Sequence, residues 1–221
     1  MGNLAIVVPA YNEAEEIENV ILAASLYGDV IVVDDGSSDD TNIRAKKAKA
    51  RVIVHSKNRG YEAALETGMQ VAVTEGYLYA ITLDADGQHD PVLIKQFADM
   101  LLQQGMDLVV GDRDVLQRWS EVVFSKCGSL LWNLTDPLSG MKGYRLSWLI
   151  EIGAFDTRGL VGSELAVKMI VNGAKFSEIP ILTRARTGES RYGDGFWANM
   201  KIIKALIVLI FLNKTRSIKI G

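Results

Sequence analysis

Short apolar runs alternate with amphipathic stretches along the first half of the chain. The runs have the length of buried strands, and the stretches between them carry apolar residues at spacings of three and four, which is typical of helices. We therefore predict an α/β fold with a mostly parallel central sheet and helices on both faces. The pattern places strands at residues 4–9, 29–34, 51–55, 77–83 and 106–111, helices at 13–26, 60–74 and 91–103, and a polar helix between 34 and 51.

The second half of the chain is less regular. It predicts a helix at 119–134, a turn-rich stretch at 136–140, a helix at 163–172 and a strand at 175–182, followed by a loop at 183–195. No internal repeat or linker divides the sequence. We therefore expect one domain over residues 1–195, with residues 196–221 as a C-terminal attachment.

The C-terminal attachment contains an unbroken apolar run at 205–212. As a helix, eight residues extend about 12 Å, far less than the hydrocarbon core of about 30 Å, so we do not expect the run to cross a bilayer. Phe196 and Trp197 precede it, and Lys201 and Lys204 lie beside it. This combination favours a helix in the membrane interface, attracted to anionic lipids. The alternative is a C-terminal helix that closes the protein's own core.

Composition excludes several classes of function. The formal net charge of −3 and the pI near 5.5 argue against nucleic-acid binding. The single cysteine, Cys127, fits a reducing compartment. Two histidines and one cysteine exclude a zinc site of the usual Cys/His type. We expect a peripheral protein on the cytoplasmic side of the cell membrane.

Polar residues follow the predicted strands where ligands bind in open parallel sheets, beyond the carboxyl ends of the strands. These residues are PAYNE at 9–13, DDGSSD at 34–39, DADGQH at 84–89 and GDR at 111–113. Neither a G-x-G-x-x-G loop after the first strand nor a P-loop is present, so the sequence supports neither a dinucleotide cofactor nor P-loop hydrolysis. The negative charge of a bound nucleotide must then be met in another way.

A divalent cation is the natural counter-charge. Asp84, Asp86 and Gln88 offer two carboxylates and an amide oxygen, which are hard ligands suited to Mg²⁺ or Mn²⁺ bridging a diphosphate. Acidic pairs after strands are common, and a helix N-cap role for Asp86 or Asp90 is the simpler alternative.

Three ordered motifs resemble those of family 2 glycosyltransferases: VVPAYNE at 7–13, VVDDGSSDDT at 32–41 and LDADGQHDP at 83–91. Within that family the chain is similar to the polyprenyl-phosphate glycosyltransferases, of the dolichol-phosphate mannose or glucose synthase type. Shorter matches follow at 111–113, 139–140 and 184–191. The resemblance implies a GT-A-type nucleotide-sugar-binding fold, a nucleoside-diphosphate sugar as donor and Mg²⁺ or Mn²⁺ as cofactor.

The resemblance also implies roles for individual residues. Nucleotide-sugar contacts are expected from Pro9, Tyr11, Glu13, Asp34, Asp35, Asp84 and Arg113, with Asp35 accepting from base N–H groups and Asp34 shaping the turn. Metal ligands are expected at Asp84, Asp86 and Gln88, and contacts with the acceptor phosphate at Ser139, Arg184, Arg186 and Arg191. The catalytic candidates are Asp86, Arg113, Arg186 and Glu164.

Each role has a simpler alternative. Pro9 and Tyr11 also suit plain turn chemistry, and Arg113 suits a surface ion pair. Glu164 is the candidate general base for a hydroxyl acceptor, but a charge at a helix N-terminus explains it as well. Tyr61 is a departure from the family pattern, because many relatives carry a lysine there that could touch the donor diphosphate.

The resemblance implies transfer of a sugar, with inversion, to a polyprenyl phosphate at the membrane surface. The second pKa of a phosphate monoester is about 6, so this nucleophile needs no general base at neutral pH. Three alternatives remain: transfer to a soluble or polysaccharide hydroxyl, a non-catalytic membrane-associated subunit that binds nucleotide-sugar, and a nucleotidyltransferase, which the missing glycine-rich basic loop disfavours. A separate membrane subunit and a homo-oligomer are both open as partners.

Overall fold

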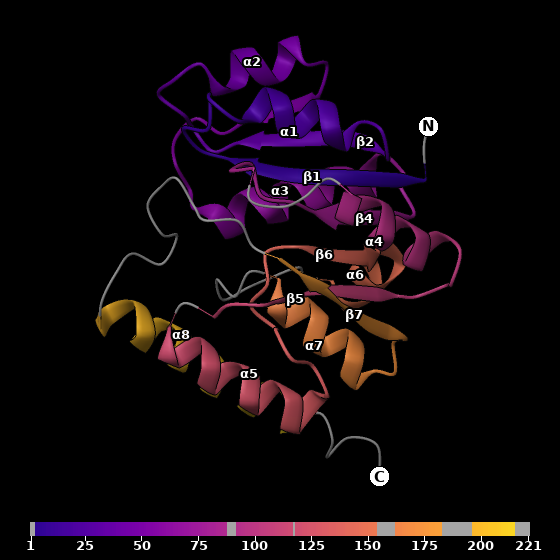
Figure 1. The fold of residues 1–221 in the computed structure, drawn as a ribbon, viewed down its shortest axis with the longest axis vertical. Helices are drawn as coiled ribbons and strands as arrows, with labels where there is room; N and C mark the ends of the chain where they lie inside the picture. The colour runs from indigo at the N-terminus through magenta and orange to yellow at the C-terminus, as the bar shows by residue number, and fades with distance from the viewer. Residues whose placement is uncertain (1–2, 88–91, 117, 154–161, 183–195, 215–221) are drawn as a thin grey trace.

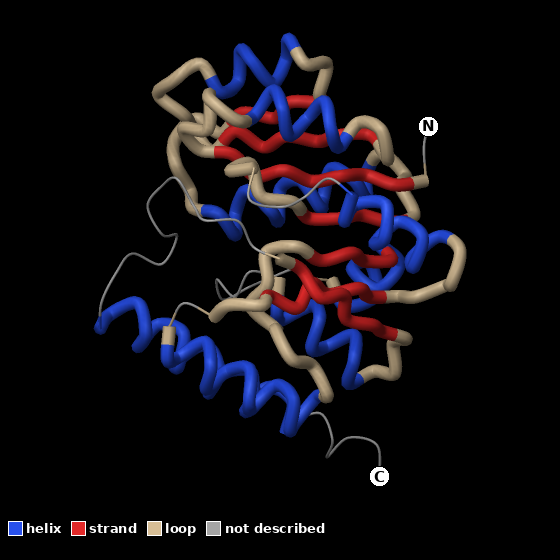
Figure 2. Tube along the Cα trace, in the orientation of Figure 1, coloured by secondary structure: helices blue, strands red, loops and turns tan. Residues whose placement is uncertain are grey.

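Strands from both halves of the chain form one sheet, and helices cover both of its faces (Figure 1). The computed structural model describes residues 3–87, 92–116, 118–153, 162–182 and 196–214. Within these residues the sheet has seven strands in the order β3-β2-β1-β4-β6-β5-β7. Figure 2 shows the strands side by side in one sheet, with a layer of helices on each face. The predicted α/β class with a mostly parallel sheet is confirmed.

The element boundaries agree with the sequence pattern over the first half of the chain. The strands are β1 (Leu4–Ala10), β2 (Asp29–Asp34), β3 (Arg51–Val54), β4 (Tyr79–Thr82), β5 (Leu108–Arg113), β6 (Lys142–Arg145) and β7 (Phe176–Ile181). The helices are α1 (Ile17–Ala24), α2 (Thr41–Lys47), α3 (Tyr61–Thr74), α4 (Val92–Leu102), α5 (Trp119–Trp132), α6 (Leu146–Ile152), α7 (Ser163–Val171) and α8 (Phe196–Lys214).

The central strand β1 is buried along its whole length because helices cover both of its faces. Ala5 and Val7 face a core cluster that includes residues of α3, α5, α7 and α8. Leu4 and Ile6 face a second cluster, which includes residues of α1 and α4. β1 pairs in parallel with β2 and β4, so the carboxyl ends of these three strands meet at one edge of the sheet.

Helix α3 lies close against the sheet because it carries a glycine where it crosses β1. A Cβ at Gly68 would clash with the side chain of Val7 and would lie 3.2 Å from Cγ2 of Val33. This close approach fixes the position of the first residue of α3, Tyr61, near the end of β4.

The sequence pattern did not predict β6 and α6. β6 has only four residues, KGYR, and it pairs antiparallel with both β4 and β5. Such a short segment has no apolar run of its own, so its two neighbours define it as a strand. Gly143 lies where α4 packs closely, since a Cβ there would be 2.8 Å from Cδ1 of Leu101.

The C-terminal segment is helical and packs beside α5 (Figure 1). Ile202, Leu206 and Leu209 are buried in the core, so one side of α8 does close the protein's interior. The backbone N–H of Ser120 donates to Oδ1 of Asn199 at 3.4 Å and links the two helices. Among the described residues, no helix has both the length and the apolar character that crossing a bilayer requires.

Candidate functional site

A cavity of about 620 Å³ opens at the carboxyl ends of the parallel strands. The segments that follow β1, β2, β3 and β4 all contribute to its wall, as expected for an open parallel sheet. The described residues that line it are Pro9, Ala10, Tyr11, Asn12, Glu13, Ala14, Glu15, Glu16, Asp35, Asp39, Asn58, Gly60, Tyr61, Ala64, Asp84, Ala85 and Asp86.

Asp84 and Asp86 share this cavity, directly after β4. Asp84 is buried, and its Oδ1 accepts a hydrogen bond from the hydroxyl of Tyr61 at 2.7 Å. The third expected ligand, Gln88, lies outside the described residues. The structure therefore brings the two predicted carboxylates together on one cavity wall.

Asp35 is a second buried carboxylate of the cavity and organises the loop before α3. Its Oδ1 accepts from the backbone N–H of Arg59 at 2.9 Å, and its Oδ2 accepts from the N–H of Gly60 at 2.7 Å. Nδ1 of His55 lies 2.6 Å from Oδ1. Asp35 thus holds three partners within the protein, and its predicted contact with a nucleobase stays a prediction.

His55 ties Asp35 to helix α3. Its Nε2 lies 3.0 Å from Oγ1 of Thr67, which donates its own proton to the carbonyl of Ala63 at 2.8 Å. The sequence reasoning did not select His55. The available signal was its place at the end of a predicted strand, in a chain with only two histidines.

Asp34 lies beside Asp35 but is fully buried and is absent from the described cavity wall. Its Oδ1 accepts from the backbone N–H of Ser37 at 3.0 Å, which closes the turn after β2. The same turn is linked to the loop after β1, because the N–H of Asn12 donates to Oγ of Ser37 at 2.9 Å. Asp34 therefore holds the turn after β2, and its predicted contact with the nucleotide-sugar stays a prediction.

The cavity wall is acidic. Seven of its described lining residues are Asp or Glu, and none of those described is Lys or Arg, so the described wall concentrates negative charge, which favours binding of a cation. Asp39 is one of the seven; burial alone would raise its pKa, but hydrogen bonds from Thr41 and Ala14 outweigh burial and hold the pKa below its ordinary value.

The donor set of the cavity fits a hard divalent cation. Mg²⁺ is usually held by one or two carboxylates together with water and substrate phosphates, and Asp84 and Asp86 supply such a pair. No group of three or more His, Cys, Asp or Glu side chains suited to a metal occurs in the described part of the chain.

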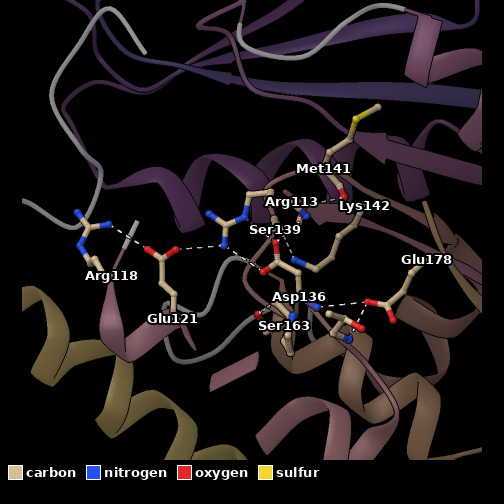
Figure 3. Close-up of polar contacts among 11 residues, drawn as sticks. Arg113, Arg118, Glu121, Asp136, Ser139, Met141, Lys142, Ser163 and Glu178 are labelled. Atoms are coloured by element: carbon tan, nitrogen blue, oxygen red, sulfur yellow. Dashed lines mark hydrogen bonds and ion pairs between the residues drawn. The ribbon is translucent and has the colours of Figure 1, made fainter. Parts of the chain in front are cut away.

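Arg113 ends β5 and lies in a cluster of charged side chains (Figure 3). Its Nε and Nη2 donate to the two carboxylate oxygens of Asp136, at 2.6 and 3.0 Å. Nη2 also lies 3.4 Å from Glu121, which pairs with Arg118 at 3.0 Å. Arg113 thus pairs with buried carboxylates and is not among the described residues of the cavity wall, and its predicted contact with the nucleotide-sugar stays a prediction.

Two further candidates are buried. Ser139 is fully buried, and its Oγ donates to the carbonyl of Met141 at 3.5 Å, so contact with an acceptor phosphate requires its exposure. Glu164 is 3% exposed, and its Oε1 accepts from Nζ of Lys168 at 2.6 Å, one helical turn along α7. Neither belongs to the cavity wall in the described residues.

Arg184, Arg186 and Arg191 lie outside the described residues.

The turn that holds Asp136 is itself tied to three elements. Glu178 on β7 accepts from the backbone N–H groups of Thr135 at 2.7 Å and Asp136 at 3.2 Å. Ser163 donates to the carbonyl of Pro137, and Nζ of Lys142 donates to the carbonyl of Ser139 (Figure 3). The predicted turn at 136–140 therefore also has a structural role, whereas the sequence motif suggested a site role only for Ser139.

The motifs and the cavity match a known family. The sequence model described as glycosyl transferase family 2 matches residues 5–118, which includes every described residue of the cavity wall. The chain belongs to glycosyl transferase family 2. The family recognised from the three sequence motifs is thus confirmed, and with it the assignment as a glycosyltransferase.

Similar proteins include enzymes named for lipid-phosphate acceptors. A dolichyl-phosphate hexose transferase of Haloferax volcanii is 30% identical, over 97% of this chain and 96% of its own length. A UDP-N-acetylglucosamine–dolichyl-phosphate N-acetylglucosaminyltransferase of Methanococcus voltae is 34% identical, over 92% of this chain and 94% of its own. The resemblance to the polyprenyl-phosphate enzymes is confirmed at this level.

The fold is that of solved GT-A glycosyltransferases. Glucosyl-3-phosphoglycerate synthase from Mycobacterium tuberculosis, in complex with Mn²⁺, UDP and phosphoglyceric acid, superimposes with a TM-score of 0.74 at 22% identity. The match covers 95% of this chain and 78% of that one. At this identity the likeness shows the fold alone.

Proposed function

We propose that this glycosyltransferase transfers a sugar, with inversion and with a divalent cation, from a nucleoside diphosphate to a polyprenyl phosphate at the membrane surface. The observation that carries the proposal is the acidic cavity in which Asp35, Asp84 and Asp86 converge at the strand ends. The names of two similar archaeal proteins give dolichyl phosphate as the acceptor, which supports the proposal.

The donor binds in this cavity with its base near Asp35 and its diphosphate near Asp84 and Asp86. When bound, Mg²⁺ or Mn²⁺ neutralises charge that builds on the leaving diphosphate. Asp84, Asp86 and Gln88 hold it, and Pro9, Tyr11 and Glu13 complete the nucleotide side of the site. The arginines at 184, 186 and 191 supply further positive charge to the donor and acceptor phosphates.

The acceptor attacks the anomeric carbon through a phosphate oxygen, and the bond from that carbon to the diphosphate oxygen breaks. A phosphate monoester is largely ionised at neutral pH because its second pKa is about 6. A hydroxyl acceptor would instead need a general base, and Glu164 is buried and paired with Lys168. The phosphate acceptor is therefore the simpler fit to this structure.

The two neighbouring helices α5 and α8 supply the membrane surface. Helix α8 is apolar on its outer side as well as on the side that packs against the core. This is unusual for a helix at the surface of a soluble protein. The outer side of α5 is also apolar, and Lys126, Lys201 and Lys204 are exposed on the two helices while their one acidic residue, Glu121, is buried. Cations beside an exposed apolar face favour an anionic lipid surface. We name this surface the α5–α8 face; its exposed apolar residues are Trp119, Val122, Val123, Leu130, Leu131, Phe196, Trp197, Met200, Ile207 and Phe211.

A transfer assay tests the proposal. The full chain is incubated with labelled UDP-glucose, UDP-N-acetylglucosamine or GDP-mannose, with and without polyprenyl phosphate and Mn²⁺. We expect label to enter the organic phase with one of these donors, and only when lipid and metal are both present. Asp86→Asn removes this activity, whereas Asp99→Asn, on the exposed side of α4, leaves it unchanged. Transfer that persists in EDTA, or that reaches only soluble hydroxyl acceptors, contradicts the proposal.

A further inference from the structure

A continuous chain of contacts joins two carboxylates of the cavity, Asp35 and Asp84. In the proposed function, Asp35 lies near the base of the donor and Asp84 lies near its diphosphate. Asp35 accepts from the backbone N–H groups of Arg59 and Gly60, and the next residue, Tyr61, donates its hydroxyl proton to Oδ1 of Asp84 at 2.7 Å. No sequence motif indicated this link, because Tyr61 is the residue at which the chain departs from the family pattern.

The position of Tyr61 is fixed by its backbone. Gly60 has a φ of +96°, a region that favours glycine, and this turn leads directly into α3. Asp35 clamps the two amides before the turn, and the close packing of Gly68 on Val7 fixes the helix after it. The phenol of Tyr61 therefore reaches Asp84 from a rigid support.

A neutral donor is well suited to orient a carboxylate that holds a cation. A tyrosine hydroxyl brings one hydrogen-bond proton and no net charge, so it restricts rotation of the Asp84 carboxylate and keeps its negative charge. A lysine in the same place would partly neutralise that charge. Partners that orient a metal ligand typically change metal affinity 10- to 100-fold when they are removed.

We propose that Tyr61 is a positioning residue for the cation site: its hydroxyl holds the Asp84 carboxylate in the orientation that binds the divalent cation, and Asp35 holds Tyr61 in place through the loop at 59–60. This inference rests on the proposed cation site of the glycosyltransferase. In this role Tyr61 acts on the cation through Asp84, and it does not need to contact the diphosphate.

The test measures Mn²⁺ binding directly, by the loss of the free-ion signal in electron paramagnetic resonance as protein is added. We expect Tyr61→Phe to weaken Mn²⁺ binding about tenfold or more, without loss of the folded structure. Tyr77→Phe is the matched control. Its hydroxyl also bonds an aspartate, Asp29 at 3.0 Å, but Asp29 begins β2 and so lies at the opposite edge of the sheet. Equal Mn²⁺ affinities of the Tyr61→Phe and Tyr77→Phe variants overturn the inference.

A double-mutant cycle separates positioning from general disturbance of the loop. If Tyr61 acts through Asp84, then Tyr61→Phe causes no further loss of Mn²⁺ affinity in an Asp84→Asn background. Additive losses contradict this role. A wild-type protein that binds no Mn²⁺ removes the proposed cation site and this inference together, whereas wild-type binding that Tyr61→Phe leaves intact removes only the inference.

Discussion

Arg113 and Asp136 form a bidentate ion pair, with parallel hydrogen bonds of 2.6 and 3.0 Å, in a part of the protein that is almost closed to solvent. Arg113 belongs to the motif at the end of β5, and Asp136 to the turn before β6. The pair therefore joins the end of β5 to the turn before β6. It lies next to α5, because Arg113 also pairs with Glu121 of that helix (Figure 3).

Arg113→Ala is expected to lower the free energy of unfolding by about 3–5 kcal/mol, because it leaves two buried carboxylates, Asp136 and Glu121, without this cation. Arg113→Lys keeps the charge but loses the planar fork, so its effect is smaller. Urea unfolding measures both. A stable Arg113→Ala variant that no longer transfers sugar would instead support the nucleotide-sugar contact that the family resemblance implies for Arg113.

The pH dependence of stability follows from Asp112, next to this pair. Burial, and then the charge of Asp136, raise the pKa of Asp112 above its ordinary value, despite the opposing effect of Arg113. A raised pKa in the folded state means that the favourable contribution is present below the unfolded pKa of 3.8 and is lost as the pH rises through the folded value. Asp112→Asn should therefore gain stability relative to the wild type as the pH rises from 4 toward neutrality. Unfolding of both proteins across that range, with the exposed Asp99→Asn as control, tests the sign.

His55 should matter for stability through Asp35. The two side chains are 5% and 4% exposed, so His55→Phe leaves the carboxylate without its side-chain partner in a buried place. We expect a loss of about 3 kcal/mol in the free energy of unfolding. Thr67→Val removes only the neutral partner of the other ring nitrogen and should cost about 1 kcal/mol. Equal losses of stability in the two variants would show that the His55–Asp35 contact contributes no more to folding than the His55–Thr67 contact.

Membrane binding should depend on the α5–α8 face. Trp119→Glu and Trp197→Glu place a negative charge on side chains that are 56% and 78% exposed, among lysines that attract anionic lipid. We expect each to reduce sedimentation with phosphatidylglycerol vesicles, with the double variant losing most of it. Leu26→Glu is the control, because Leu26 is 76% exposed but follows α1 at the other end of the molecule (Figure 1). If all four variants bind vesicles equally, this face is not the membrane surface.

Prediction from sequence worked best where one segment carries its own signal. β1 and β2 are apolar runs bounded by polar residues, so their type and boundaries could be read directly. Asp84 and Asp86 could be assigned to one cavity because the carboxyl ends of parallel strands share an edge. β6 could not be found, since its four residues become a strand only through hydrogen bonds to β4 and β5.

The sequence by itself determined the order of strands and helices in the first half of the chain, the family, and the acidic residues of the cavity, because apolar spacing and short motifs are local properties of the chain. Only the tertiary structure decided which polar groups meet. It paired Arg113 with Asp136, buried Ser139 and Glu164, and directed Tyr61 to Asp84. A hydrogen bond or ion pair depends on distances of about 3 Å between side chains from separate segments, and residue types alone do not specify those distances.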